Sequence, residues 1–197
     1  MEITAKMVKE LRDKTGAGMM DCKKALGEAK GDVEKAVTVL REQGIAKASS
    51  KAGRATSEGA VVPYIHPGDK LGVLVEINCE TDFVARTDAF KEFARNVAMH
   101  IAASAPLCVS REGVDQELVE KERSIFKAQA EKDGKPANII DKIVDGKIEK
   151  YYNEIVLLEQ PYVKDTDMSV GDLVKETIGS LGENIQIKRF TRFRLGE

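Results

Sequence analysis

Apolar residues recur at helical spacing in three short stretches between residues 3 and 46. Met7 and Leu11 belong to an apolar stripe in the first stretch, which ends at the glycines of KTGAG. The second stretch, MMDCKKALGEAKG, has the same period. Asp32 is placed to cap a third, whose apolar positions continue to Leu40. This pattern predicts a bundle of three short helices with a thin core.

The composition changes over residues 46–59, where AKASSKAGRATSEG is small, polar and without an apolar period. Such a run is typical of a linker or of a loosely held helix end. We therefore predict a three-helix module over residues 1–46, a linker over residues 47–59 and a single core domain over residues 60–197.

The core domain begins with a predicted β-hairpin. Two extended runs in AVVPYIHPGDKLGVLVEINC flank HPGDK, in which Pro, Gly and Asp are turn formers. In the second run Val73, Val75 and Ile77 share one face of the expected strand. An apolar helical face follows between Phe90 and Ile101, which predicts a helix directly after the hairpin.

The rest of the core is predicted to mix helices and strands. Residues 113–150 read as two helices joined near KDGKPAN, with Pro136 in the first turn of the second. NEIVLLEQPYV is predicted as a strand, SVGDLVKETIGSL as a helix, and ENIQIKRFTRFRL as a strand with a bulge between Ile187 and Phe190. This order predicts an α+β fold in which helices pack on a small antiparallel sheet.

Composition and charge narrow the class of protein. Hydrophobic residues make up 42% of the chain, and 31 Lys and Arg oppose 33 Asp and Glu, which gives a net charge of −2 and argues against direct nucleic-acid binding. No apolar run is long enough to span a bilayer and the N-terminus does not resemble a signal peptide, so we expect a cytoplasmic protein. Three widely spaced cysteines indicate reduced thiols, and with only two histidines we expect no metal site and no cofactor.

Sequence motifs for covalent chemistry are missing. The chain has no phosphate-binding G-x-x-x-x-G-K-[ST], no G-x-G-x-x-G, no H-E-x-x-H and no G-x-S-x-G. Lys23 and Lys24 could lower the pKa of the Cys22 thiol, but no histidine is near in sequence and an ordinary semi-buried thiol is favoured. His66 flanks a turn and could be an exposed contact, whereas His100 ends an apolar helix face and is expected to be structural. These residues favour a binding protein over an enzyme.

Two stretches are candidate contact surfaces. In CETDFVAR a strand ends and a helix begins, so Thr81 or Asp82 is expected to cap the helix. From the residues alone, Phe83 is expected to be buried in the core beside that cap. In TGAGMMDCKKAL, one helix face cannot easily bury both Met19 and Met20, and flexible methionine side chains suit a contact surface.

The same two stretches carry a family resemblance. ELRDKTGAGMMDCKKAL and INCETDFVAR resemble the signature stretches of the translation elongation factor Ts family, the nucleotide-exchange factors for elongation factor Tu. NVAMHIAAS, DGKPANIIDKIVDGKI and GENIQIKRF extend the resemblance through the whole chain. It implies that the three-helix module is similar to a ubiquitin-associated domain, and that no covalent chemistry is involved.

The resemblance also implies a site. Thr81, Asp82, Phe83 and Val84 would form a tip that intrudes into the nucleotide domain of elongation factor Tu and disturbs its Mg²⁺ and phosphate site, with Phe83 as the wedge. This reverses the expectation that Phe83 is buried. Further contact residues implied by the resemblance are Arg12, Met19, Met20 and His66.

The length of the chain implies an assembly. Longer members of the family carry two related core subdomains and a helical dimerisation hairpin, whereas about 140 residues follow the linker here, enough for one subdomain. We therefore expect a homodimer and a two-to-two complex with the GTPase. Some short members of the family are bridged by a cysteine near the C-terminus, and because no cysteine follows Cys108 here, we expect any dimer to be non-covalent through that region. An adaptor with another partner, or a small enzyme using Cys22 or His66, are the alternative hypotheses.

Overall fold

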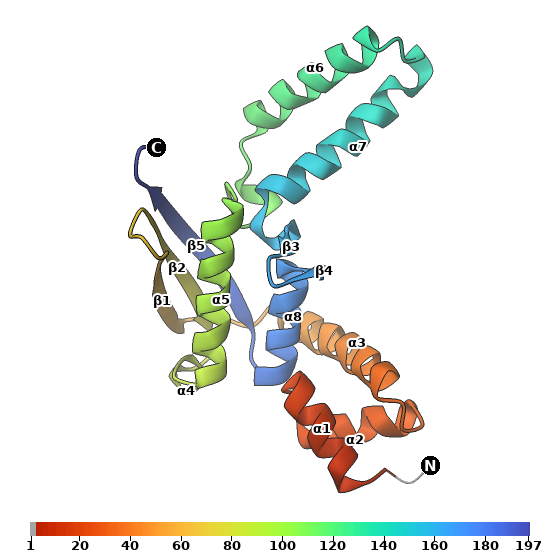
Figure 1. Ribbon diagram of the computed structural model, residues 1–197, viewed down its shortest axis with the longest axis vertical. Coiled ribbons are helices and arrows are strands. Elements are labelled where there is room, and N and C mark those ends of the chain that lie inside the picture. The colour runs from red at the N-terminus through yellow and green to blue at the C-terminus, as the bar shows by residue number, and fades with distance from the viewer. Residues whose placement is uncertain (1–2) are drawn as a thin grey trace. The chain divides into compact units, whose positions relative to one another are not determined.

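The computed structural model describes residues 3–197 and has the expected mixture of helices and strands (Figure 1). The helices are α1 (Ala5–Thr15), α2 (Met19–Glu28), α3 (Val33–Lys51), α4 (Asp82–Ala85), α5 (Asp88–Ser104), α6 (Gln116–Lys132), α7 (Ala137–Ile155) and α8 (Val170–Leu181). The strands are β1 (Glu58–Ile65), β2 (Leu71–Cys79), β3 (Pro161–Tyr162), β4 (Asp165–Ser169) and β5 (Ile185–Arg194). Strands β1, β2 and β5 form a three-stranded sheet in the order β1-β2-β5, and β3 pairs with β4 in a separate antiparallel pair. The predicted α+β class is confirmed.

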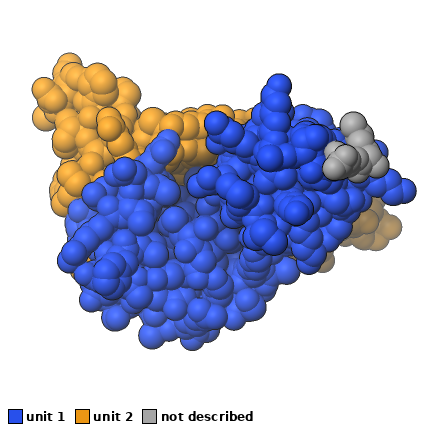
Figure 2. Space-filling model, turned by 90° about the horizontal axis from the view of Figure 1, so that it is seen from below, with its two compact units in different colours: residues 1–61, 77–94, 172–186 blue, residues 62–76, 95–171, 187–197 orange. Residues whose placement is uncertain are grey.

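The chain divides into two compact units (Figure 2). Unit 1 comprises residues 1–61, 77–94 and 172–186, and unit 2 comprises the remainder of the chain. The strands of the larger sheet contribute residues to both units.

The three N-terminal helices of unit 1 are confirmed. Thr4 caps α1 by accepting a hydrogen bond from the Met7 amide at 3.3 Å, and Asp32 caps α3 in the same way. Their shared core is small, as the sequence predicted, and is centred on residues with little or no exposed area: Val8, Leu11, Cys22, Ala25, Leu26, Ala29 and Ala36. Helix α3 continues to Lys51, so the first residues of the predicted linker are helical. The domain boundaries and the ubiquitin-associated character of the module stay predictions.

Helix α3 also packs against α8 within unit 1. The contact is close because two glycines meet there: a Cβ atom on Gly179 would lie 2.9 Å from the Cα atom of Gly44. Nearby, Arg41 pairs with Glu176 at 3.4 Å, and the Ser180 hydroxyl donates to the carbonyl of Gly16 at 3.1 Å. The three-helix module is therefore attached along one side to α8.

The predicted hairpin is formed by β1 and β2. The amide of His66 donates to the carbonyl of Leu71 at 2.9 Å across the turn. Gly59 lies so close to β2 that a Cβ atom there would be 2.2 Å from the carbonyl oxygen of Ile77, and its φ of 146° suits only glycine. The alternation of buried residues along β2 is confirmed, with Val73, Val75, Ile77 and Cys79 all buried.

One predicted strand is wrong. NEIVLLEQPYV was expected to be extended, but α7 continues to Ile155, a 3₁₀ turn covers Leu157–Glu159, and only β3 is a strand. Ile155, Val156 and Leu157 are all buried, and a short buried apolar run has the same pattern whether it ends a helix or forms a strand. Pro136 is the N-cap of α7 and precedes the first helical turn, in which it was expected.

Unit 2 contains a pair of long antiparallel helices, α6 and α7, which lie side by side (Figure 1). Arg111 holds the base of this pair: its guanidinium donates to Glu149 at 2.7 and 3.1 Å and to Glu159 at 2.5 and 2.7 Å. The same group lies 4.3 Å from the centre of the Tyr152 ring. The two predicted helices of residues 113–150 are thus confirmed.

Candidate partner-binding site

The TDFV stretch forms a short tip in unit 1. Strand β2 ends at Cys79, and Thr81, with extended backbone (φ −130°, ψ 154°), caps the four-residue helix α4 by accepting the amide of Val84 at 3.4 Å. The predicted cap is therefore confirmed at Thr81. Phe83 is 78% exposed, so the expectation of a buried Phe83, drawn from the residues alone, is wrong. A four-residue helix has no opposite buried face, and the aromatic ring points away from the core.

Two local contacts support the tip. Asp82 and Arg86 form an ion pair at 2.8 Å across one turn of helix, and the Cys79 thiol donates to the carbonyl of Thr81 at 3.1 Å. Asp82 remains half-buried beside its partner. The tip therefore presents one large apolar side chain next to a paired carboxylate.

A residue that sequence reasoning missed holds the tip from behind. Glu183, in the loop between α8 and β5, accepts hydrogen bonds from the amides of Glu80 at 3.1 Å and Thr81 at 3.0 Å. Its other carboxylate oxygen accepts the Thr81 hydroxyl at 2.6 Å. Pairing over 102 residues of sequence leaves no periodic signal, although Glu183 lies in GENIQIKRF, a stretch that carried the family resemblance.

The candidate contact residues of the three-helix module lie at the start of α2 and on α1. Met19 is 57% and Met20 75% exposed, so neither adjacent methionine is buried in the module core. Arg12 is also exposed, on α1. All three belong to unit 1, as do the tip residues.

His66 belongs to unit 2, in the turn between β1 and β2. Its side chain is exposed, and Nδ1 lies 3.1 Å from the hydroxyl of Tyr64. The expected exposure at a Pro-Gly turn is confirmed, and a role in contacting a partner stays a prediction.

Comparison with known proteins identifies the family. The sequence model described as "Elongation factor TS" matches residues 2–197. The chain belongs to the elongation factor Ts family. It is 60% identical over 195 residues to elongation factor Ts of Carboxydothermus hydrogenoformans, covering 99% of this chain and 90% of that protein. It is 62% identical to the protein of that name from Solidesulfovibrio magneticus, covering 99% and 98%, and 59% identical to that of Koribacter versatilis, covering 100% and 90%.

Membership of the elongation factor Ts family confirms the resemblance carried by the two signature stretches. The chain spans at least nine tenths of these three relatives, so they have similar lengths. The TDFV tip and the methionine pair of α2 lie in the two stretches that carry the resemblance, and Phe83, Met19 and Met20 are exposed there.

The alternative hypothesis of an enzyme that uses Cys22 is not supported by the surroundings of this thiol. Cys22 is fully buried, and burial raises the pKa of its thiol above the usual value, with a smaller opposing effect from the Thr15 hydroxyl. The hypothesis that Lys23 and Lys24 lower this pKa is wrong. A buried thiol with a raised pKa is a poor nucleophile.

Residues 3–197 contain no group of three or more His, Cys, Asp or Glu side chains arranged to hold a metal ion. Over the same residues, no helix is both long and apolar enough to cross a membrane. His100 is buried, as expected, and both ring nitrogens have hydrogen-bond partners: Nε2 lies 2.9 Å from Gln160 Oε1, and Nδ1 accepts the Val163 amide at 3.2 Å.

Proposed function

We propose that this protein is a guanine nucleotide exchange factor that binds elongation factor Tu, disturbs its magnesium and phosphate site and releases GDP during translation elongation. The observation that carries the proposal is the exposed Phe83, held at a capped tip in a member of the elongation factor Ts family. The protein acts by binding, in the cytoplasm, without covalent chemistry and without a cofactor of its own.

The mechanism follows from how a GTPase holds its nucleotide. Mg²⁺ requires near-ideal octahedral geometry and bridges the phosphates, so a small displacement of a loop that supplies a ligand weakens both the metal and GDP. The tip of Thr81, Asp82, Phe83 and Val84 supplies that displacement, with Phe83 as the wedge. Because binding linkage is reciprocal, a newly bound nucleotide lowers the affinity for the exchange factor by the same ratio as the exchange factor lowers the affinity for nucleotide. A new nucleotide therefore releases the exchange factor.

The size of the effect can be worked from Phe83. A phenylalanine buries roughly 150–250 Å² when fully covered, and 78% of it is still exposed, so about 120–200 Å² remains to be buried by a partner. At about 25 cal/mol per Å², this area stabilises the inserted state by at most about 3–5 kcal/mol. That corresponds to about two to nearly four orders of magnitude in an equilibrium or rate.

The other candidate contact residues are proposed to contribute to the binding of elongation factor Tu. Arg12, Met19 and Met20 are exposed on the three-helix module, and methionine side chains adapt to an uneven partner surface. His66 adds a contact from the β1–β2 turn. These residues are proposed to determine affinity, whereas the tip determines the rate of nucleotide release.

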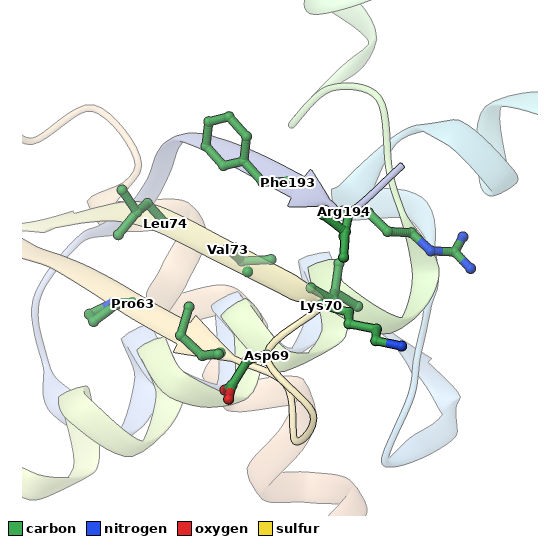
Figure 3. Close-up of a pocket in the computed structure, with 11 residues that line it drawn as sticks. Pro63, Asp69, Lys70, Val73, Leu74, Phe193 and Arg194 are labelled. Atoms are coloured by element: carbon green, nitrogen blue, oxygen red, sulfur yellow. The ribbon is translucent and has the colours of Figure 1, made fainter. Parts of the chain in front are cut away.

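We also propose that the protein acts as a homodimer in a two-to-two complex. Within unit 2, large apolar side chains are exposed along the hairpin and the end of β5: Ile65 (59%), Leu74 (45%), Phe193 (69%) and Leu195 (77%). They surround a shallow hollow of about 520 Å³, where Leu74 and Phe193 extend from neighbouring strands (Figure 3). Contiguous apolar surface of this kind is rare on monomers, which supports its burial against a second copy. A Phe193→Glu variant that stays dimeric in light scattering would show that this face is not the interface.

The exchange function is tested by loading elongation factor Tu with a fluorescent GDP analogue and following its release. We expect the intact protein to accelerate release strongly and Phe83→Ala to retain little of the acceleration. Leu107→Ala is the matched control, since Leu107 is also an exposed apolar residue (62%) but lies outside the tip. Unchanged release with the intact protein refutes the exchange function, and binding without any change in release would indicate an adaptor. If Phe83→Ala accelerates release as strongly as the intact protein, the role of Phe83 as a wedge is wrong but the exchange function stands.

A further inference from the structure

The exchange tip cannot hold its own conformation. Helix α4 has four residues, and a helix that short is unstable by itself because nucleation fixes several dihedral angles for one hydrogen bond. Phe83 adds little packing, because 78% of it is exposed. Beside its two local contacts, the Asp82–Arg86 ion pair and the bond from the Cys79 thiol, the tip therefore depends on contacts with another part of the chain.

Glu183 supplies these contacts with one carboxylate. Oε2 accepts two successive backbone amides, those of Glu80 and Thr81, at 3.1 and 3.0 Å. Successive amides that point at one anion form a concave binding site for negative charge. Oε1 accepts the hydroxyl of Thr81 at 2.6 Å. This uses the only hydrogen of that hydroxyl and leaves its lone pairs for the amide of Val84, so the cap of α4 is oriented by Glu183.

The contact is reciprocal. While Glu183 binds the amide of Glu80, the Glu80 carboxylate accepts the amide of Asn184 at 2.6 Å. Two adjacent backbone segments thus bind each other's amides through their glutamates, as in the capping box of a helix. We call this pair of residues, Glu80 and Glu183, the glutamate clasp.

The loop that bears Glu183 is itself fixed. Gly182 has a φ of 79°, a left-handed conformation that ends α8 and turns the chain toward the tip. The side-chain amide of Asn184 donates to the carbonyl of Arg54 at 2.8 Å, and Lys51 donates to the carbonyl of Gly182. Glu183 is therefore held between the tip and the end of α3.

From this geometry we infer that Glu183 is a positioning residue for nucleotide exchange: it holds the TDFV tip in the one conformation in which Phe83 can act as a wedge. The inference rests on the proposed exchange function. Glu183 acts through Thr81 and the backbone of the tip, so it affects the insertion step and leaves docking of the three-helix module unchanged. Without it, only the fraction of molecules with an ordered tip can insert, and the maximal rate falls to that fraction of its value for the intact protein.

The test separates insertion from docking. Release of fluorescent GDP from elongation factor Tu is measured over a range of concentrations for the intact protein, Glu183→Ala, Glu183→Gln and the control Glu92→Ala, which removes an exposed glutamate of α5. We expect Glu183→Ala to lower the maximal rate by about 10- to 100-fold, with a change of less than about threefold in the half-saturating concentration. Glu183→Gln keeps an oxygen for the two amides and is expected to recover part of the rate. Glu92→Ala is expected to behave as the intact protein.

Two further measurements make the inference independent of stability. Adding Phe83→Ala to Glu183→Ala is expected to lower the maximal rate by less than about threefold more, because an unheld tip has already lost the wedge. In the free protein, hydrogen exchange at the amides of residues 80 and 81 is expected to be faster in Glu183→Ala, while that of β2 is unchanged.

The outcomes distinguish the inference from the function on which it rests. An intact protein that does not accelerate release refutes both. If Phe83→Ala slows release and Glu183→Ala does not, the exchange function stands and the positioning role is wrong. Multiplicative effects of the two substitutions, or a raised half-saturating concentration at an unchanged maximal rate, would also overturn the positioning role.

Discussion

His100 provides the sharpest test of how unit 2 is held together. The ring is fully buried on α5, and the Val163 amide donates to Nδ1 at 3.2 Å, so that nitrogen carries no proton. Nε2 therefore carries the proton and donates to Gln160 Oε1 at 2.9 Å. The side-chain amide of Gln160 in turn donates to the carbonyl of Glu154 at 2.6 Å, which extends the hydrogen-bond network to the end of α7. One imidazole thus links α5 to the segment that follows α7.

The perturbation is His100→Leu, which introduces an apolar side chain of similar size and removes both hydrogen bonds. The buried Gln160 side-chain oxygen and the part-buried Val163 amide then lose their partners. An unpaired buried group costs about 1–3 kcal/mol, and the part-buried amide is at the low end of that range. The expected loss in the free energy of unfolding is therefore about 2–4 kcal/mol. For a chain of this size that lowers the melting temperature by about 4 to 16 °C.

The pH dependence has a definite sign. Burial lowers the pKa of His100 below its usual value, against a smaller opposing effect of Gln160. The unfolded chain takes up a proton near pH 6.5 that the folded protein refuses. The stabilisation is therefore complete above that pH and is lost as the pH falls through 6.5 toward the lowered pKa. Its slope is at most about 1.4 kcal/mol per pH unit.

The assay is urea unfolding at several values between pH 7.5 and 5.5, followed by circular dichroism. We expect the intact protein to lose stability on acidification and His100→Leu to show a smaller slope from a lower starting value. His66→Gln is the control because it removes the other histidine, which is exposed. Equal slopes for the intact protein and His100→Leu would refute the assignment of the buried neutral imidazole.

Three other predictions concern separate parts of the chain. Gly59→Ala places a Cβ atom 2.2 Å from a β2 carbonyl oxygen at a residue with positive φ, so we expect the free energy of unfolding, measured in urea, to fall by more than about 2 kcal/mol. An unchanged unfolding midpoint would contradict the close approach of the two strands. Arg111→Leu breaks an ion-pair network that is partly exposed, so we expect the free energy of unfolding to fall by only about 1–2 kcal/mol and amide exchange to become faster at the start of α6 and the end of α7. Unchanged exchange there would show that Arg111 does not hold the base of the helix pair. Burial raises the pKa of all three thiols, but Cys108 is only half-buried whereas Cys22 and Cys79 are buried. We therefore expect iodoacetamide at neutral pH to modify Cys108 first, as followed by mass spectrometry, and early modification of either buried thiol would contradict the described core.

Local patterns predicted local structure well. The helical period of the N-terminal stretches, the turn residues between β1 and β2 and the threonine before α4 all depend on neighbours within a few positions. The strand predicted at NEIVLLEQPYV failed because Ile155 and Val156 are buried at a helix end, and burial alone does not distinguish the two structures. Pattern is most reliable where an element has two unlike faces.

The candidate site could be predicted only in part. General burial tendencies placed Phe83 in the core, and the family resemblance alone indicated that it projects. Neither indicated Glu183, because its partners Glu80 and Thr81 are more than a hundred positions away and an isolated glutamate in a loop has no periodic signal. Long-range side-chain contacts with the backbone are visible only once the chain is folded.

The distance along the chain between the TDFV tip and Glu183 has a consequence for protein synthesis. The carboxylate that binds the Thr81 amide is encoded 102 positions later. At about 5–20 residues per second, a ribosome adds that residue roughly 5–20 seconds after Thr81. During this interval the nascent chain contains the complete tip sequence without the residue whose carboxylate binds it. On the positioning role proposed for Glu183, a chain interrupted before this residue carries the whole motif without the carboxylate that holds it, and competence for exchange is acquired only in the last steps of its own translation.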